Sequence, residues 1–160
     1  MSAPGSLRVH GNAVAIGERG ILIRGPSGAG KSGFSLALLD GAERRGVYAA
    51  LVADDRTLIS AVNGRIMAAG VPGFEGLIER RGEGLIRVRY EPSVVIGLVV
   101  DLAPHGRHLL RFPEQEERTA QILGLEAPAL DLDFAADPGS CVAATMRKLR
   151  FGSPAIANFA

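Results

Sequence analysis

Short apolar runs with strand-like composition dominate the first part of the chain. Residues 7–16 are rich in β-forming side chains, and a second apolar run at 21–23 follows the turn-like segment 17–20. Apolar residues then recur at helical spacing over 31–44, and Gly46 provides a helix stop. The pattern therefore predicts a β-hairpin that leads directly into a helix.

After this helix the pattern returns to strands. The apolar run 48–53 predicts a buried strand that ends at two carboxylates. Residues 57–62 and 65–69 flank Asn63-Gly64, which is a strong signal for a tight hairpin. We therefore expect a buried strand followed by a second hairpin.

Further along, strand patterns alternate with less regular segments. Residues 70–84 are rich in glycine and proline around a charged cluster, which is typical of a functional or mobile loop. Residues 85–90 alternate and residues 94–102 are almost all apolar, which predicts an exposed strand followed by a buried one. Two more helices are predicted, over 113–123 and 139–150.

The hairpin signals before residue 90 decide the expected fold class. Consecutive parallel strands would need helical crossovers, and the sequence offers none there. We therefore expect an α/β domain with a mixed, strongly curved sheet around the first helix, not a regular doubly wound sheet. The length of 160 residues suits a single domain over the whole chain.

Composition narrows the expected partners and compartment. The 18 basic and 17 acidic residues are interspersed, which argues against nucleic acid or an anionic membrane as a partner. No stretch reaches the ~18 apolar residues of a membrane span, and residues 1–5 lack the pattern of a signal peptide. A single cysteine excludes an intramolecular disulfide, so we expect a cytoplasmic protein in which Cys141 is a small buried residue.

The strongest motif lies between the first predicted hairpin and its helix. It matches G-x-x-x-x-G-K-[ST] in full, as Gly25-Pro26-Ser27-Gly28-Ala29-Gly30-Lys31-Ser32. The glycines let backbone N–H groups wrap phosphate oxygens, Lys31 reaches the outer phosphates, and Ser32 supplies a hydroxyl to Mg²⁺. The motif predicts binding of ATP with Mg²⁺ but leaves the acceptor of the phosphoryl group open.

Charged residues near this phosphate-binding loop (P-loop) are candidates for contacts with the metal, the phosphate and the proton of the acceptor hydroxyl. Asp54 and Asp55 end the buried strand, where one could orient the metal and the other accept a hydroxyl proton, or the pair forms only a turn or a helix cap. Glu79 and Arg81 lie in a glycine-rich stretch that could bring them to metal and phosphate, or they belong to a solvated loop. His10 alone, by its pattern, is more often a structural or surface residue than a catalytic one.

Taken in order, these segments resemble the catalytic domain of HPr kinase/phosphorylase. The resemblance spans residues 10–86 and rests on His10-Gly11, the P-loop, Leu51-Val52-Ala53-Asp54-Asp55, and Glu79-Arg80-Arg81-Gly82-Glu83-Gly84-Leu85-Ile86. It implies an ATP-dependent kinase that phosphorylates a serine on HPr, the small carrier protein of the phosphotransferase system. It also implies a homo-oligomer, namely a hexamer.

The resemblance implies roles for individual residues. His10 matches a catalytic histidine, Lys31 the P-loop lysine, and Asp55 the acid/base that takes the serine proton. Arg81 matches an arginine that is a candidate for phosphate contact.

The implied Mg²⁺ site combines three of the same segments. Ser32 and Glu79 match the metal ligands, and Asp54 is their supporting neighbour. The expected cofactors are therefore ATP and Mg²⁺.

Beyond residue 90 the chain departs from the family pattern. Arg118 could answer a downstream catalytic arginine, or it is a helix-surface residue. Where the family carries Pro-Gly-Arg-Asn, an element linked to the reverse, phosphorolytic reaction, this chain has Asp137-Pro138-Gly139-Ser140-Cys141 without the arginine. We therefore expect a short form, without the usual N-terminal domain, in which the phosphorylase activity is doubtful.

Three functions remain distinguishable at this point. The first is a kinase that phosphorylates a serine on an HPr-type phosphocarrier protein. The second is a kinase of the same fold with a small-molecule acceptor, which would require a closed pocket in place of an open face beside Asp55. The third is a sensor that binds ATP without transferring phosphate.

Overall fold

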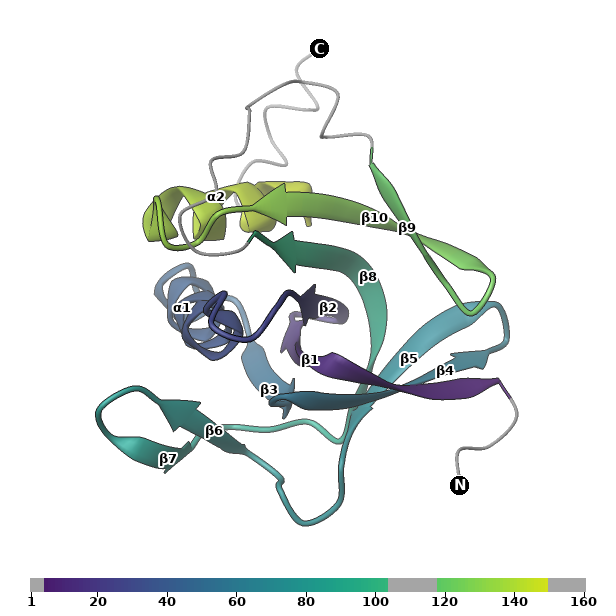
Figure 1. Ribbon diagram of the computed structural model, residues 1–160, viewed down its shortest axis with the longest axis horizontal. Helices are drawn as coiled ribbons and strands as arrows, with labels where there is room; N and C mark the ends of the chain where they lie inside the picture. Colours follow the sequence, from purple (N-terminus) through teal and green to yellow (C-terminus); the bar gives the residue numbers. More distant parts are fainter. Residues whose placement is uncertain (1–4, 104–117, 150–160) are drawn as a thin grey trace.

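The computed structural model describes residues 5–103 and 118–149 (Figure 1). In chain order, these residues form β1 (Ser6–Ile16), β2 (Arg19–Arg24), α1 (Lys31–Arg44), β3 (Ala49–Ala53), β4 (Arg56–Val62), β5 (Arg65–Gly70), β6 (Leu77–Arg80), β7 (Gly84–Arg87), β8 (Ser93–Leu102), β9 (Thr119–Ile122), β10 (Leu125–Leu132) and α2 (Pro138–Lys148). The predicted hairpins β1–β2 and β4–β5, the helix α1 and the buried strand β3 are confirmed.

Two long strands, β1 and β8, give the main sheet its curvature. Residues 6–10 of β1 pair with β4, whereas residues 11–16 pair with β2 on one side and partly with β3 on the other. In the same way β8 pairs first with β5, antiparallel, and then with β2 and β10, parallel. Because each long strand belongs to two parts of the sheet, the sheet bends back on itself, and Figure 1 shows β8 as a long arc. The expected mixed, strongly curved sheet is confirmed.

The two helices share one face of this sheet. Phe34 and Leu38 of α1 are fully buried and pack in one cluster with Ile21 and Ile23 of β2. The apolar side of α2 joins the same cluster through Met146, and Cys141 of α2 is buried there as predicted. A second cluster, which includes residues of β4 and β5, fills the space on the opposite face of the sheet. The helices therefore cover only one side, and the curled sheet closes over the other.

The strand directions bring several chain segments to one edge of the sheet. β2 and β3 both run antiparallel to β1, and β8 and β10 run parallel to β2. The carboxyl ends of β2, β3, β8 and β10 therefore meet at the same edge, next to the beginning of α1. In open α/β sheets this edge is where ligands bind.

Two sequence-based predictions are wrong. Residues 119–122, predicted as part of a helix over 113–123, form β9, because Leu123 and Gly124 adopt positive φ angles of 51° and 77° and turn the chain into a hairpin with β10. Residues 113–117 of that prediction lie outside the described residues. Within the predicted loop 70–84, residues 77–80 form β6, which pairs with β7 and buries Ile78 completely.

The C-terminal helix agrees with the prediction to within its ends. α2 covers Pro138–Lys148, and Asp137 caps it by accepting a hydrogen bond from the Ser140 N–H at 3.1 Å. Among the described residues, no helix is long and apolar enough to cross a membrane.

Candidate active site

The P-loop connects β2 to α1, in the strand–loop–helix context that its sequence requires. β2 ends at Arg24 and α1 begins at Lys31, so the glycine-rich segment lies at the amino end of the helix. Gly28 and Gly30 have φ angles of 85° and 93°, which L side chains rarely adopt. The first N–H groups of a helix have no partner within the helix, and its dipole favours negative charge there. The segment is therefore built to receive phosphate.

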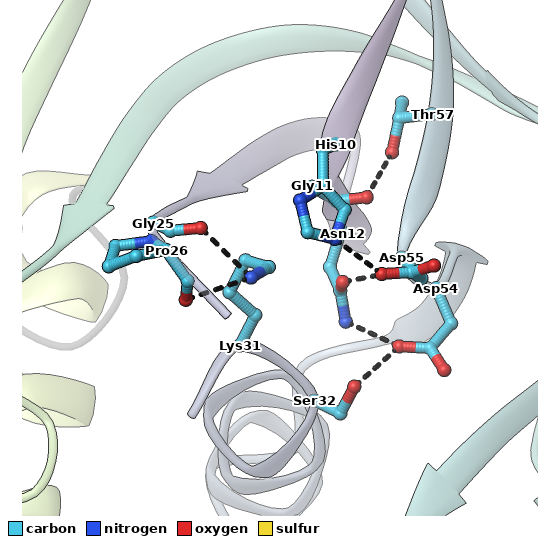
Figure 2. Close-up of polar contacts among 10 residues, drawn as sticks. All are labelled: His10, Gly11, Asn12, Gly25, Pro26, Lys31, Ser32, Asp54, Asp55 and Thr57. Carbon is cyan, nitrogen blue, oxygen red and sulfur yellow. Dashed lines mark hydrogen bonds and ion pairs between the residues drawn. The ribbon is translucent and has the colours of Figure 1, made fainter. Parts of the chain in front are cut away.

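The Lys31 side chain lies over this loop. Only 8 % of the residue is exposed, and Nζ donates hydrogen bonds to the carbonyl oxygens of Gly25 at 2.9 Å and Pro26 at 3.2 Å (Figure 2). The ammonium group is thus held above the turn by the loop's own backbone.

Asp54, directly after β3, joins the start of α1 to β6. The Ser32 hydroxyl donates to Asp54 Oδ1 at 2.6 Å, and the Glu79 backbone N–H of β6 donates to Asp54 Oδ2 at 3.2 Å. Ser32, Asp54 and Glu79 therefore meet here. Each comes from a different one of the three motifs that follow His10-Gly11, and Glu79 takes part through its backbone.

Asp55 faces a different partner because the strand has already ended. β3 stops at Ala53, and Asp55 adopts a left-handed backbone conformation with a φ angle of 70°. Its Oδ1 lies 2.7 Å from Nε2 of His10. Both side chains are well exposed, 62 % for Asp55 and 57 % for His10, so the pair opens to solvent.

Asn12 is the residue of this site that the sequence analysis missed. Its Nδ2 donates to Asp54 Oδ1 at 2.7 Å, and its Oδ1 accepts from the Asp55 backbone N–H at 2.9 Å (Figure 2). A single polar residue at the start of the buried run 11–16 was the only signal in the sequence. We call His10, Asn12, Asp54 and Asp55 the carboxylate cluster.

Gly11 lets β1 and β2 approach each other beside this cluster. A Cβ atom at Gly11 would lie 2.6 Å from the carbonyl oxygen of Ile23, which is too close. The Gly11 N–H donates to the Asp55 carbonyl oxygen at 3.0 Å, and its own carbonyl accepts from the Thr57 hydroxyl at 2.8 Å. The glycine of the histidine-glycine signature is therefore required by packing and anchors the backbone of Asp55.

Arg81 and Arg118 are not brought to the His10–Asp55 pair. Arg81 lies exposed in the turn between β6 and β7. Arg118 donates to Asp101 Oδ2, and its Nε lies 3.0 Å from Asp131 Oδ2. Arg118 thus belongs to a second group of charges at the same sheet edge.

This second group surrounds Asp101 at the end of β8. Nε and Nη2 of Arg24, the last residue of β2, donate to the two carboxylate oxygens of Asp101 at 2.7 and 2.9 Å. Burial by itself would raise the pKa of Asp101, but the hydrogen bonds and charges of Arg24 and Arg118 outweigh it and lower that pKa. We call Arg24, Asp101, Arg118 and Asp131 the arginine cluster.

A partly apolar pocket of about 450 Å³ adjoins the carboxylate cluster. Asp54 and Asp55 form part of its wall. The pocket lining also includes Phe74, Leu85 and Tyr90, which are 66 %, 69 % and 41 % exposed. Exposed apolar side chains gathered at one place mark a contact surface more often than a solvated one.

Comparison with known proteins identifies the family. The family described as HPr Serine kinase C-terminal domain matches residues 3–136 of this chain. The chain belongs to this family. An HPr kinase/phosphorylase of Clostridium tetani is 38 % identical over 100 residues, which cover 62 % of this chain and 30 % of that protein. An HPr kinase/phosphorylase of Clostridium novyi is 32 % identical over 127 residues, which cover 78 % of this chain and 38 % of that protein.

A solved structure supports the same assignment. The structure of the Hpr(Ser) kinase/phosphatase from Coxiella burnetii superposes with a TM-score of 0.71 at 26 % identity, and the match covers 88 % of this chain and 95 % of that one. The expected HPr kinase-type fold is therefore confirmed. The chain spans roughly a third of the length of the curated relatives, 30 % and 38 % in the two cases above.

The oxygen groups around Ser32 suit Mg²⁺ held together with phosphate. In the described part of the chain, no group of three or more His, Cys, Asp or Glu side chains could hold a metal by itself. Mg²⁺ prefers oxygen ligands and is commonly bound by one or two protein groups plus the substrate phosphates. The Ser32 hydroxyl and the Asp54 carboxylate, 2.6 Å apart at the amino end of α1, fit that kind of site.

Proposed function

We propose that this domain is an ATP- and Mg²⁺-dependent kinase that phosphorylates a serine on an HPr-type phosphocarrier protein. The observation that carries the proposal is the meeting, at one sheet edge, of the P-loop with Asp54 and of His10 with Asp55. Membership of the HPr serine kinase family supports the choice of acceptor. Phosphoryl transfer needs positioning and charge neutralisation more than covalent chemistry, and this edge supplies both.

The P-loop side of the site would hold the nucleotide. The backbone of residues 25–32 surrounds the phosphates, and Lys31 leaves its carbonyl partners to reach the outer phosphate oxygens. Ser32, Asp54 and Glu79 would hold Mg²⁺, directly or through water. When bound, Mg²⁺ neutralises charge on the phosphate oxygens.

The open side of the site would hold the acceptor. Asp55 accepts a hydrogen bond from the serine hydroxyl and takes its proton as the serine oxygen bonds to the γ-phosphorus and the bond to the β-phosphate oxygen breaks. His10, at 2.7 Å from Asp55 Oδ1, orients that carboxylate. Arg81 would approach the transferred phosphate from the β6–β7 turn. We leave Arg118 out of the mechanism because Asp101 and Asp131 already engage it.

The surface beside Asp55 supports a protein as acceptor. The pocket wall formed by Phe74, Leu85 and Tyr90 is exposed, not closed around a small-molecule site. An apolar wall next to the catalytic carboxylate suits an acceptor that brings its own apolar surface around the serine. We extend the proposal to a cytoplasmic homo-oligomer, such as the hexamer that the resemblance implies, and to the forward kinase reaction only.

The experiment is transfer of label from γ-labelled ATP, with Mg²⁺, to purified HPr-type proteins of the same organism. We expect label on one serine with the wild type and none above background with Lys31→Ala, while circular dichroism shows that the variant remains folded. Turnover retained by a folded Lys31→Ala protein would contradict the P-loop mechanism. Labelling of a small metabolite, or ATP binding without any transfer, would instead support one of the other two functions.

A further inference from the structure

Asn12 is a buried polar residue at the centre of the site. Only 1 % of it is exposed, and the residues that follow it in β1 are apolar and buried. A buried amide is costly unless its donors and acceptor are satisfied. Both donor hydrogens and the acceptor oxygen of Asn12 are used. Their partners are Asp54, Ser35 and the backbone of Asp55, beside the P-loop.

The hydrogen bonds of Asn12 join three segments that are distant in sequence. Nδ2 donates one hydrogen to Asp54 Oδ1 at 2.7 Å and the other to the Ser35 hydroxyl of α1 at 3.0 Å. Ser35 in turn donates to the Lys31 carbonyl oxygen at 2.8 Å. One side chain on β1 therefore ties the first turn of the P-loop helix to the carboxylate that Ser32 also contacts.

The acceptor oxygen of Asn12 serves Asp55. It takes the Asp55 N–H at 2.9 Å, while the Gly11 N–H holds the Asp55 carbonyl at 3.0 Å. These two bonds, on either side of one residue, hold Asp55 in the left-handed conformation that L residues disfavour. In that conformation the Asp55 carboxylate faces His10.

The chemistry of these partners requires an amide at position 12. Asp54 offers only acceptors and the Asp55 backbone offers a donor, so the side chain between them must donate on one side and accept on the other. A carboxylate of the same shape would accept on both sides, and an aliphatic side chain would do neither. Asparagine meets both demands with a short, stiff side chain.

We propose that Asn12 is a positioning residue that sets Asp54 and Asp55 in register with the P-loop. This inference rests on the proposed kinase function and deepens it. Asn12 touches neither nucleotide nor acceptor. It acts through Asp54, which supports the Mg²⁺ site, and through Asp55, which receives the serine proton.

Two substitutions separate the two halves of this role. Asn12→Leu keeps the size and loses every hydrogen bond, so we expect the Asp55 amide to exchange with solvent at least about tenfold faster, as measured by NMR. Asn12→Asp keeps an acceptor for that amide and loses the donors to Asp54 and Ser35, so the Asp55 amide should stay slow. In both variants we expect kcat to fall about 10- to 100-fold, with KM for the carrier protein changed less than about threefold, because the reacting groups are misplaced.

A matched control accounts for simple destabilisation. Thr145→Val, on α2, also removes a buried side-chain hydrogen bond, from the Thr145 hydroxyl to the Cys141 carbonyl, and should leave kcat and the Asp55 amide unchanged. If kcat and Asp55 exchange in Asn12→Leu stay within about twofold of the wild type, the positioning role is wrong. If Asn12→Leu does not fold, kcat of Asn12→Asp alone decides in the same way.

Failure of the kinase function can be told apart from failure of this inference. A wild type that labels no carrier protein would overturn the proposed function but still bind ATP through its P-loop. Two other measurements then test the positioning role of Asn12. One is the increase in the ATP affinity of Asn12→Asp when Mg²⁺ is added, and the other is the exchange rate of the Asp55 amide in Asn12→Leu. Loss of that increase together with fast exchange supports the positioning role, and wild-type behaviour in both overturns it.

Discussion

Two charged clusters lie at the same sheet edge, and they balance their charges in opposite ways. In the arginine cluster, two arginines meet two aspartates, and the Asp101 side chain is only 24 % exposed. In the carboxylate cluster, two adjacent aspartates have one histidine and one amide as side-chain partners from β1, and the Asp55 side chain is 62 % exposed. Removing one member of a paired, half-buried group of charges leaves an uncompensated charge and destabilises the fold, whereas exposed carboxylates held in a fixed geometry remain able to react.

The two clusters also differ in what holds them. Arg24 and Asp101 are the side chains of neighbouring parallel strands, β2 and β8, and they are Cα partners in the pairing register. Asp55 is held through its own backbone, by Gly11 and Asn12, in a disfavoured conformation. The first arrangement strengthens the sheet just before the P-loop, and the second uses the sheet to aim a carboxylate.

Replacing aspartate by asparagine should therefore have opposite consequences in the two clusters: a loss of activity in the carboxylate cluster and a loss of stability in the arginine cluster. The largest effect is expected at Asp55. Asp55→Asn removes the proton acceptor but keeps the shape, so we expect kcat for transfer to the carrier protein to fall about 100-fold or more. The melting temperature should change little, because the side chain is exposed and its backbone contacts remain. Steady-state kinetics and thermal denaturation on the same preparation measure both. A folded Asp55→Asn protein with wild-type kcat would remove Asp55 from the mechanism.

The elements of the fold that could be predicted are those whose signal lies in a few neighbouring residues. The hairpins β1–β2 and β4–β5 and the P-loop have their turn residues next to one another in sequence, so they were predicted. β9 was missed because a four-residue strand has too short a pattern, and its pairing with β10 decided its structure. β6 was missed for the same reason, since its pairing with β7 is what makes it a strand.

The residues of the two clusters and the P-loop divide in the same way, into those that lie in a local motif and those that do not. His10, Lys31, Ser32, Asp54 and Asp55 each lie in a recognisable motif, and the structure brings them to one edge. Asn12 has no motif, because its role depends on partners 23, 42 and 43 residues away. The arginine cluster could not be predicted either. The parallel pairing of β2, β8 and β10 brings Arg24, Asp101 and Asp131 together, and the hydrogen bond from the Ala129 N–H to the Arg118 carbonyl adds Arg118.

The second prediction is the reverse of the first. Asp101→Asn leaves Arg24 and Arg118 without a full negative partner in a half-buried place, so we expect unfolding to become easier by about 2 kcal/mol, less than the cost of breaking a fully buried pair. Transfer activity per folded molecule should stay within about threefold of the wild type. Urea denaturation measures the stability, and active-site titration with nucleotide corrects the activity for unfolded protein. Unchanged stability together with a large loss of kcat would show that this cluster takes part in catalysis.

The smallest expected effect is the pH dependence of the difference in stability between the wild type and Asp101→Asn. Arg24 and Arg118 lower the pKa of Asp101 below its ordinary value of 3.8, so the folded state binds this proton less readily than the unfolded state does. The contribution of Asp101 to stability is therefore fully present above about pH 5 and decreases as the pH falls through 3.8 toward the lowered value. Asp101→Asn has no proton to bind at this position, so the difference in unfolding free energy between wild type and variant should shrink between pH 6 and pH 3.5, by no more than about 0.7 kcal/mol, in urea denaturation at constant ionic strength. Glu18→Gln, in the exposed turn between β1 and β2, is the control for the general effect of removing a carboxylate. A difference that stays constant over this range would mean that the arginines do not favour the charged form of Asp101, and that the contrast between the two clusters is not electrostatic.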